Sequence, residues 1–406
     1  MMEQPNPPRR LRIFYIAQRV PYPPDRGDKI ITYNEVRHLV RHHEVHVFCS
    51  ADGVQDLENI AKLQEYVESV TAEPVTSLGG KLRALLAIFL GGSLSVAAFY
   101  NRQLHETIKK YFAQSKPDLL MVYSSNAAQY AEHFDNVPRI MHFSDLDSLK
   151  WGQYAERSGP LLSWVYRLEQ HRLLTYERHI AHTFSHSLVC TEAERKDFER
   201  LIPGVPVSLL ENGVDIEYFH PQGTAKHPAS MVFTGVMDYQ PNVDAVQWFC
   251  SEILPLVQRE ITDASFVICG SRPVQAVLRL AQLPGVTVTG RVPDTRPYMD
   301  AAHVFVAPLR MARGIQNKVL EALAMGLPCV ASLAAWRGTV IPSGEGIVAT
   351  DDPQEFAHLV IRLIRDDGYR EQMADKARQS ALKHYTWEAQ MQRLDPVIEA
   401  VTKPCG

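Results

Sequence analysis

The chain of 406 residues lacks the cysteine patterns that disulfide frameworks and zinc sites require. Its six cysteines are scattered, none of them forms a C-x-x-C pair, and several lie within apolar, strand-like segments. We interpret them as reduced core residues of a cytoplasmic protein. The sequence also lacks a long basic run, and its net charge is −4. We therefore do not expect nucleic acid as a partner.

Long apolar runs are also absent. The N-terminal residues contain no apolar stretch followed by a cleavage site, so we expect no signal peptide. The most apolar run, ALLAIFLGGSLSVAAFY at 84–100, is short for a membrane span and is interrupted by two glycines. The favoured interpretation is two amphipathic helices that meet at this turn. The alternative is a peripheral contact of residues 81–100 with the inner face of a membrane, because Lys81 and Arg83 flank the apolar part.

The sequence does contain a regular alternation of strand-like and helix-like segments, in two sets. A stretch at 212–230, rich in proline, glycine and polar residues, separates the two sets. The expected strands of the first set are 11–18, 44–50, 118–125, 139–145 and 187–192. The expected strands of the second set are 231–237, 264–270, 286–290, 303–309, 328–332 and 346–350.

Strands separated by helices of ten or more residues predict a doubly wound parallel sheet. We therefore predict an α/β fold with two Rossmann-like domains. The carboxyl ends of their strands would face a cleft, where ligands of open α/β sheets bind. No G-x-G-x-x-G follows the first strand, which argues against a nicotinamide-dependent dehydrogenase.

One expected helix of the second set carries charged residues at the end that would face that cleft. In ARGIQNKVLEALAMGLPCVAS, residues 312–332, the residues Gly314, Lys318 and Glu321 fall on one stripe. The helix should begin just after Gly314, and its N-terminus attracts an anion, most often a phosphate. Lys318 and Arg313 would add cations there, and Glu321 would accept hydrogen bonds from ribose hydroxyls. The alternatives are an exposed Lys318–Glu321 ion pair of little energy and a solvated loop arginine.

Three segments occur in an order that is typical of one enzyme family. They are LLENGVDIEYF (209–219), VFTGVMDYQPN (232–242) and KVLEALAMGLPCVAS (318–332). They resemble the domain junction, the first strand of the second domain and the E-A-x-A-x-G-x-P signature of the group 1, or family 4, glycosyltransferases. RVPYPPDRGDKI, HFSDLDSLKW and ARGIQNKVLEALAMG further resemble a subgroup of sugar transferases linked to exosortase/PEP-CTERM and exopolysaccharide loci.

The resemblance implies the GT-B fold and a retaining glycosyltransferase of the hexosyltransferase type. Its donor would be a nucleoside-diphosphate sugar and its acceptor a glycan or a lipid-linked molecule, in exopolysaccharide or cell-surface polysaccharide biosynthesis. No cofactor or metal would be obligatory. The acceptor domain would comprise residues 1–203, with a final helix in 386–406 packing back on it. The donor domain would comprise residues 204–385.

The resemblance also assigns residues to the donor site. Glu321 corresponds to the ribose-binding glutamate of the family, and Gly314 to the loop that approaches the donor sugar. Gly27 corresponds to the first-domain loop that reaches over the diphosphate. Gly235 and Asn317 complete the expected donor site.

Two positions depart from the family pattern. A second glutamate, eight residues before the ribose-binding one, is replaced here by Arg313. The loop at 235–242 contains neither the arginine nor the lysine that usually bind the diphosphate. We infer that Arg313 and Lys318 take over the phosphate contacts and count them among the candidate catalytic residues.

HFSDLDSLKW contributes two further candidate catalytic residues. Asp145 and His142 lie at or just beyond the end of an expected strand, where active-site residues concentrate. The family often has a histidine or an aspartate near this point, close to the donor sugar. The alternatives are a core histidine at position 142 and a helix N-cap at position 145.

Other functions remain as alternatives. A metal site on the stripe His179, His182 and His186 lacks a convincing carboxylate or cysteine, so we expect no metal. A catalytically silent GT-B protein could bind a nucleotide sugar or glycan within a polysaccharide assembly complex, which would explain the missing glutamate and loop cations. A nucleotide-sugar 2-epimerase shares the architecture but lacks the E-A-x-A-x-G-x-P signature in this form.

Overall fold

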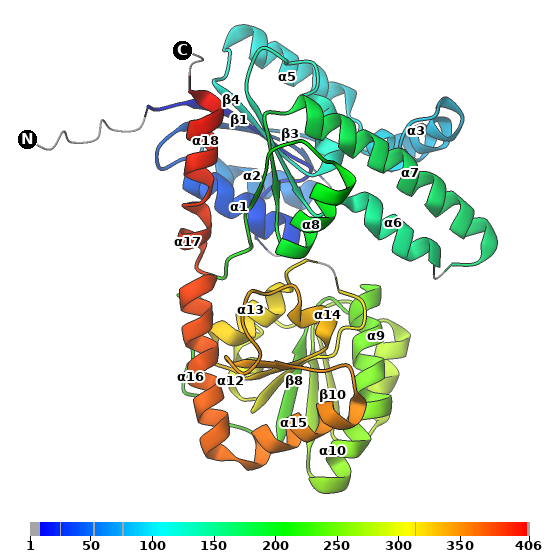
Figure 1. The fold of residues 1–406 in the computed structure, drawn as a ribbon, viewed down its shortest axis with the longest axis vertical. Coiled ribbons are helices and arrows are strands. Elements are labelled where there is room, and N and C mark those ends of the chain that lie inside the picture. The colour runs from blue at the N-terminus through cyan, green and yellow to red at the C-terminus, as the bar shows by residue number, and fades with distance from the viewer. Residues whose placement is uncertain are drawn as a thin grey trace, which may run out of the picture. The chain divides into compact units, whose positions relative to one another are not determined.

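The chain forms two compact units in a computed structural model, and each unit is built around a parallel sheet flanked by helices (Figure 1). One unit is Met1–Leu210 with Met391–Gly406, and the other is Glu211–Gln390. The structure describes residues 9–24, 26–51, 53–74, 77–156, 158–312 and 314–403. The predicted α/β class with two Rossmann-like domains is confirmed.

The first unit contains a seven-stranded sheet in the order β3-β2-β1-β4-β5-β6-β7. Its strands are β1 (Arg12–Ala17), β2 (Glu44–Ala51), β3 (Ser69–Pro74), β4 (Leu119–Tyr123), β5 (Arg139–Ser144), β6 (His186–Val189) and β7 (Val207–Leu209). The five predicted strands are present. β3 and β7 were not predicted, because they lie at the two edges of the sheet, are only partly buried, and lack a continuous apolar run. The strand order reverses between β1 and β4, which is where ligands of such sheets bind.

The helices of the first unit flank this sheet (Figure 1). They are α1 (Gly27–Leu39), α2 (Val54–Gln64), α3 (Ser77–Leu90), α4 (Leu94–Phe99), α5 (Arg102–Gln114), the 3-10 helix η1 (Ser125–Tyr130), α6 (Asp147–Glu156), α7 (Pro160–Thr183), α8 (Glu192–Leu201) and α18 (Leu394–Thr402). The favoured interpretation of residues 84–100, two helices that meet at a glycine turn, is confirmed by α3 and α4. Within the described ranges, no helix has the length and apolarity needed to cross a bilayer.

Two buried glutamates of α7 hold the starts of neighbouring helices. Glu169 accepts hydrogen bonds from Ser93 Oγ (2.7 Å) and from the backbone N–H of Leu94 (2.6 Å), at the start of α4. Glu177 accepts from the backbone N–H of Ser148 (3.3 Å), at the start of α6, and burial raises the pKa of Glu177 to about 8. The first backbone N–H groups of a helix have no partner within the helix, and these side-chain oxygens accept their hydrogen bonds. These contacts make α7 the frame on which α4 and α6 are placed.

The second unit contains a six-stranded sheet in the order β10-β9-β8-β11-β12-β13. Its strands are β8 (Ser230–Thr234), β9 (Ser265–Cys269), β10 (Val286–Gly290), β11 (Val304–Ala307), β12 (Cys329–Ala331) and β13 (Ile347–Ala349). All six were predicted, including the partly buried edge strand β10. The helices are α9 (Gln240–Trp248), the π-helical turn η2 (Phe249–Ile253), α10 (Leu254–Glu260), α11 (Gln275–Leu278), the 3-10 helix η3 (Arg279–Gln282), α12 (Arg296–Asp300), α13 (Asn317–Ala324), α14 (Leu333–Trp336), α15 (Pro353–Arg365), α16 (Asp367–His384) and α17 (Trp387–Met391).

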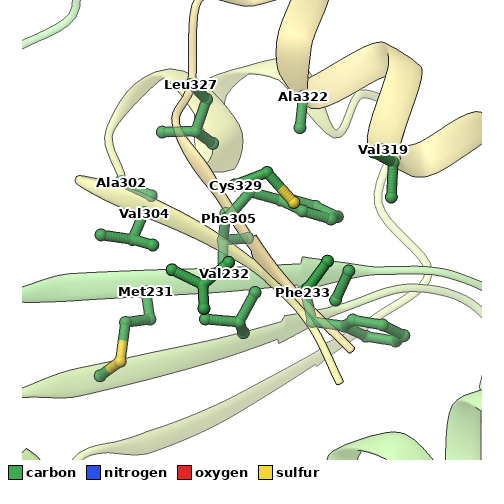
Figure 2. Close-up of a cluster of buried hydrophobic side chains, with 14 of the residues drawn as sticks. Met231, Val232, Phe233, Ala302, Val304, Phe305, Val319, Ala322, Leu327 and Cys329 are labelled. Carbon is green, nitrogen blue, oxygen red and sulfur yellow. The ribbon is translucent and has the colours of Figure 1, made fainter. Parts of the chain in front are cut away.

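The helix α13 packs on the centre of the second sheet. Figure 2 shows Val319 and Ala322 of α13 pointing toward the sheet, where Phe233 of β8 and Phe305 of β11 also lie in the core. All four side chains are fully buried. Gly326, with φ +62°, follows the end of the helix, where a left-handed glycine is common. Because the apolar face of α13 is fixed on the sheet, its polar residues are held in a defined position beside the strand ends.

The last helix of the chain belongs to the first unit, as the fold class predicted. His38 Nε2 of α1 lies 2.6 Å from Asp395 Oδ1 of α18. Thr386 caps α17, since its hydroxyl oxygen accepts a hydrogen bond from the backbone N–H of Ala389 (3.2 Å). The buried apolar residues of α18 are Leu394, Val397 and Ile398.

Candidate functional site

The candidate site of the second unit lies where β8 ends and α13 begins. Lys318, in the first turn of α13, donates a 2.6 Å hydrogen bond from Nζ to Asn242 Oδ1 of α9. The same ammonium lies 4.3 Å from the centroid of the Phe233 ring. Burial lowers the pKa of Lys318 to about 7. Since a nearby negative charge favours the protonated form of an amine, this lysine would interact strongly with an anionic ligand.

Gly235 follows β8 directly and leaves room for this ammonium. A Cβ atom at Gly235 would lie 2.8 Å from Lys318 Nζ and 2.7 Å from Asn242 Nδ2. A Cβ atom at Gly270, just after β9, would lie 1.6 Å from the carbonyl oxygen of Gly235. The two glycines therefore allow two strand-end loops and the lysine to meet at one point. The structure brings together two residues that the sequence assigned to the donor site, Gly235 and Lys318.

Glu321 lies nearly one helical turn after Lys318 on α13. Its side chain is partly buried, and burial raises the pKa of Glu321 to about 7, an effect that the charge of Lys318 opposes. Two neighbouring groups whose pKa values both move toward neutrality are typical of functional sites. When ionised, the carboxylate offers two acceptor oxygens to hydroxyl donors.

Asn317 starts α13 and contacts Asn212 of the segment LLENGVDIEYF (209–219). Asn212 Nδ2 donates a 2.8 Å hydrogen bond to Asn317 Oδ1. Within the described part of the chain, Asn212 Oδ1 and Thr234 Oγ1 are buried and have no hydrogen-bond partner. Thr234 is the last residue of β8, next to Gly235. Buried polar atoms without a protein partner are expected to bind water or a ligand.

The loop before α13 contains Gly314 and Arg313. Gly314 has φ +66°, a left-handed conformation that glycine adopts without strain. Its carbonyl oxygen would lie 2.3 Å from a Cβ atom at Gly338, so two glycines also permit this close backbone contact. Arg313, a candidate for phosphate binding, lies outside the described residues.

Two arginines pair with acidic residues in or just after the loop at 235–242, which has no cation of its own. Arg272, in the loop after β9, forms an ion pair with Asp238 (3.0 Å). Arg310, after β11, forms an ion pair with Asp244 of α9 (2.5 Å). Sequence reasoning missed both arginines, and it also missed Asn242 as the partner of Lys318. Each comes from a segment far along the chain, and only the strand order brings these segments together.

In the first unit, His142 lies in the core. The side chain is fully buried, and Nδ1 lies 2.6 Å from Glu35 Oε1 of α1. The Tyr15 hydroxyl donates a hydrogen bond to the other oxygen of the same carboxylate. Burial raises the pKa of Tyr15 well above its usual range. This environment corresponds to the alternative interpretation of His142 as a core histidine, and Glu35 is a partner that the sequence did not indicate.

Asp145 lies just after β5 and shares one cation with Asp147. Lys150 Nζ donates hydrogen bonds of 2.9 Å to a carboxylate oxygen of each residue. Burial lowers the pKa of Lys150, but the two carboxylates outweigh this effect and raise it well above its usual value. Burial also raises the pKa of Asp147. Asp145 is therefore an acceptor held in place by a neighbouring ammonium.

Gly27 is the first residue of α1 and is exposed. Asp28, which follows it, accepts a 3.0 Å hydrogen bond from Arg19. Lys29 is buried and pairs with Asp56 (3.0 Å). Gln18, Arg19, Asp28, Lys29, Thr32 and Tyr123 lie close together at the end of β1.

Among the residues that the structure describes, no group of three or more His, Cys, Asp or Glu side chains could hold a metal ion. The histidine stripe of α7 and β6 has other partners. His182 Nδ1 lies 2.8 Å from the carbonyl oxygen of Arg178, and His186 Nε2 lies 2.9 Å from Ser208 Oγ.

Comparisons with known proteins agree with this architecture. Residues 228–366 match the family described as glycosyl transferases group 1. A comparison with curated protein sequences finds no match. Sucrose-phosphate synthase from Thermosynechococcus elongatus is a similar solved structure, with a TM-score of 0.67 and 16% identity over 96% of this chain and 99% of that chain.

Two ligand complexes are also similar. Anabaena HepE in complex with UDP-glucose has a TM-score of 0.64 and 15% identity, over 96% of this chain and 100% of that chain. A variant of S. aureus TarM in complex with Fondaparinux, alpha-GlcNAc-glycerol and UDP has a TM-score of 0.66 and 10% identity, over 96% of this chain and 99% of that chain. The chain therefore has the GT-B fold of glycosyltransferases, and its residues 228–366 match the group 1 glycosyl transferases.

Proposed function

We propose that the chain is a retaining glycosyltransferase of the hexosyltransferase type, with a nucleoside-diphosphate sugar as donor. The observation that carries the proposal is the position of Lys318, a partly buried cation in the first turn of a helix, fixed by Asn242 and given room by Gly235. All three residues lie within 228–366, the region that matches the group 1 glycosyl transferases. The complexes of Anabaena HepE with UDP and UDP-glucose support a donor of this class.

The acceptor in this proposal is a hydroxyl of a glycan or of a lipid-linked molecule. The complex of S. aureus TarM with Fondaparinux and alpha-GlcNAc-glycerol supports a glycan acceptor for this fold. The sequence motifs shared with sugar transferases of exopolysaccharide loci favour polysaccharide biosynthesis as the pathway.

In the proposed reaction, Lys318 and the N-terminus of α13 bind the diphosphate. When the bond between the sugar carbon and the diphosphate oxygen breaks, negative charge increases on the leaving oxygens. The ammonium and the helix dipole stabilise this charge more strongly in the transition state than in the ground state. The acceptor hydroxyl attacks the same carbon from the face of the departing diphosphate and passes its proton to a phosphate oxygen. The anomeric configuration is thereby retained.

The remaining candidate residues have supporting roles in this proposal. Glu321 accepts hydrogen bonds from the ribose hydroxyls, and Gly314 and Asn317 shape the backbone around the donor. Arg313 supplies a second cation for the diphosphate. Asp145, oriented by Lys150, accepts a hydrogen bond from a sugar hydroxyl. We assign His142 no contact with substrate, because its side chain is fully buried.

Release of the nucleoside diphosphate from a panel of UDP-, GDP- and dTDP-sugars, with and without glycan acceptors, tests the proposal. We expect release from at least one donor, and we expect Lys318→Met to reduce it by about a hundredfold, as for loss of an electrostatic contact to the leaving group. Lys196→Met, which removes an exposed lysine of α8, is the matched control and should match the wild type. Absence of release from every donor and acceptor would refute the proposal.

A second candidate function is a catalytically silent protein that binds a nucleotide sugar within a polysaccharide assembly complex. It is favoured by the loop at 235–242, whose only charged residue, Asp238, is already paired with Arg272. A silent protein would show a thermal shift with one nucleotide sugar but would release no nucleoside diphosphate. A 2-epimerase would instead return the sugar inverted at carbon 2, which product analysis would detect.

A further inference from the structure

The first unit carries exposed apolar side chains on two helices. On α3 they recur at i, i+3, i+4, i+7 and i+8, a spacing that places them on one helix face: Leu82, Leu85, Leu86, Phe89 and Leu90. Phe89 and Leu90 are each 82% exposed. At the start of α7, Leu161 is 79% exposed and Trp164 is 61% exposed. Grouped exposure of large apolar side chains is rare in soluble proteins and marks an interaction surface.

The opposite face of α3 is built from small residues. A Cβ atom at Gly80 would lie 2.7 Å from the carbonyl oxygen of Ala98 in α4, and Ala87 is buried. Larger side chains could not occupy this face without pushing α3 away from α4. The helix is therefore oriented with its small residues toward the protein and its large apolar residues toward the outside.

The end of α3 lies against the middle of α7. Arg172 of α7 donates hydrogen bonds to the carbonyl oxygens of Ala87 (3.0 Å) and Ile88 (3.0 Å) near the end of α3. Trp164 precedes Arg172 by eight residues on the same helical stripe, about 12 Å along the axis. In Figure 1, α3 and the joined ends of α6 and α7 extend from the same side of the first sheet. The apolar patch comprises Leu82, Leu85, Leu86, Phe89, Leu90, Leu161, Leu162 and Trp164.

The segments that carry the apolar patch contain more basic than acidic residues. Residues 74–105 contain three Lys or Arg and no Asp or Glu, and residues 156–168 contain two Arg and one acid, Glu156, in a chain of net charge −4. Arg102 and Arg167 are exposed. An apolar face with basic neighbours suits the interface of an anionic bilayer. A second copy of the chain would bring the same cations together and would be repelled.

We propose that the apolar patch inserts into the head-group region of an anionic lipid bilayer. In this arrangement α3 lies in the membrane plane, and Trp164 occupies the interface, where tryptophan is enriched. Membrane binding is independent of the glycosyltransferase activity. One consequence rests on the proposed function: the bound chain reaches a lipid-linked acceptor at the inner face of the membrane.

Co-sedimentation of the full chain with vesicles tests this proposal. We expect binding to vesicles of equal parts phosphatidylcholine and phosphatidylglycerol, and weaker binding to phosphatidylcholine alone. The double variant Phe89→Ser/Leu90→Ser should bind vesicles about a hundredfold more weakly, because two inserted apolar side chains are lost. Arg167→Glu should weaken binding to the anionic vesicles alone, by about tenfold. Leu278→Ser, at an exposed apolar residue of the second unit, is the matched control and should bind like the wild type.

Any of three results would overturn the proposal, and the first two concern vesicle binding itself. The first is absence of wild-type binding to the anionic vesicles, and the second is a loss in Leu278→Ser equal to that of the double variant. The third is a wild-type dimer that the double variant dissociates, without vesicle binding, which would assign the apolar patch to a second copy. Circular dichroism and the melting temperature verify folding. UDP affinity, measured on the same preparations, should be equal in the wild type and the double variant. A wild type that binds vesicles but no nucleotide sugar would count against the proposed function alone.

Discussion

Lys318 Nζ lies 2.6 Å from Asn242 Oδ1, and a Cβ atom at Gly235 would collide with both side chains. Three residues, from α13, α9 and the loop after β8, thus fix one ammonium at the edge of the second sheet. The ammonium is costly to charge in this place, since burial lowers the pKa of Lys318 to about 7. This cost makes the role of Lys318 measurable in both binding and stability.

The affinity for UDP should fall as the pH rises from about 7 to 9. Above its pKa the Lys318 side chain is neutral, whereas the bound diphosphate favours the charged form, so binding must take up a proton. The expected loss is about 1.4 kcal/mol, or tenfold, per pH unit. Calorimetry measures it, and Lys318→Arg, which stays charged, should flatten the profile. An affinity that does not change with pH in the wild type would remove Lys318 from the diphosphate site.

Lys318→Met should weaken UDP binding yet raise the melting temperature of the second unit. A folded-state pKa below the unfolded value means that charged Lys318 destabilises the fold. This destabilisation is complete below pH 7 and disappears as the pH rises toward the unfolded pKa of the lysine. Allowing for its partial exposure, we expect an increase of about 2–4 °C at pH 7. Calorimetric melting checks it, with Lys196→Met as control. A lower melting temperature would show that the bond to Asn242 outweighs the cost of burial.

Glu321→Gln should weaken binding of UDP by about 1–3 kcal/mol above pH 7, as expected for hydrogen bonds to a charged group. Burial raises the pKa of Glu321 to about 7, so the wild-type carboxylate is already protonated at lower pH. The difference between variant and wild type should therefore shrink toward pH 6. The 2′-deoxy analogue of UDP should lose less affinity than UDP itself. Equal losses for both nucleotides would show that Glu321 does not contact the ribose.

Gly235→Ala should reduce UDP affinity at least about tenfold, because the added methyl group must displace Lys318 or Asn242. Gly344→Ala is the matched control. Gly344 has φ +94° and no heavy atom within 4 Å of its Cβ position, so that variant carries backbone strain without a collision. Isothermal titration of both proteins separates the two effects. If both variants bind UDP like the wild type, the geometry at Gly235 is not part of the donor site.

Leu394→Ala should destabilise the first unit by about 2–5 kcal/mol, the usual cost of truncating a fully buried leucine. Removal of residues 391–406 should have a larger effect, because the acceptor of the His38 hydrogen bond is lost as well. Urea denaturation measures both. Ala400→Ser, at an exposed position of α18, should leave the stability unchanged. If all three proteins unfold at the wild-type urea concentration, α18 is not needed for the first unit.

An element can be predicted from the sequence when its residues share one environment along its whole length, because they then form a regular pattern. β8 and β11 have continuous apolar sequences because both faces are covered, and they were found. β3 and β7, partly buried at the sheet edges, have no such pattern and were missed. The stripe of Lys318 and Glu321 could be predicted because it follows from helical spacing alone.

Partners that come from distant segments could not be predicted in the same way. Asn242 is 76 positions from Lys318, and Glu35 is 107 positions from His142. No local periodicity relates such pairs, because only the strand order brings them into contact. For the same reason the sequence placed His142 correctly at a strand end but could not show that α1 covers it with a carboxylate.

The return of α18 to the first unit has a consequence for biosynthesis. The first unit is made of two separate stretches, Met1–Leu210 and Met391–Gly406, whereas the second is one continuous stretch between them. Every residue of the second unit therefore leaves the ribosome before Leu394 does. During translation the second unit can fold completely while the first unit still lacks α18. The surface around His38 stays uncovered until then. The usual order, in which the N-terminal domain folds first, is reversed for the final step of this chain.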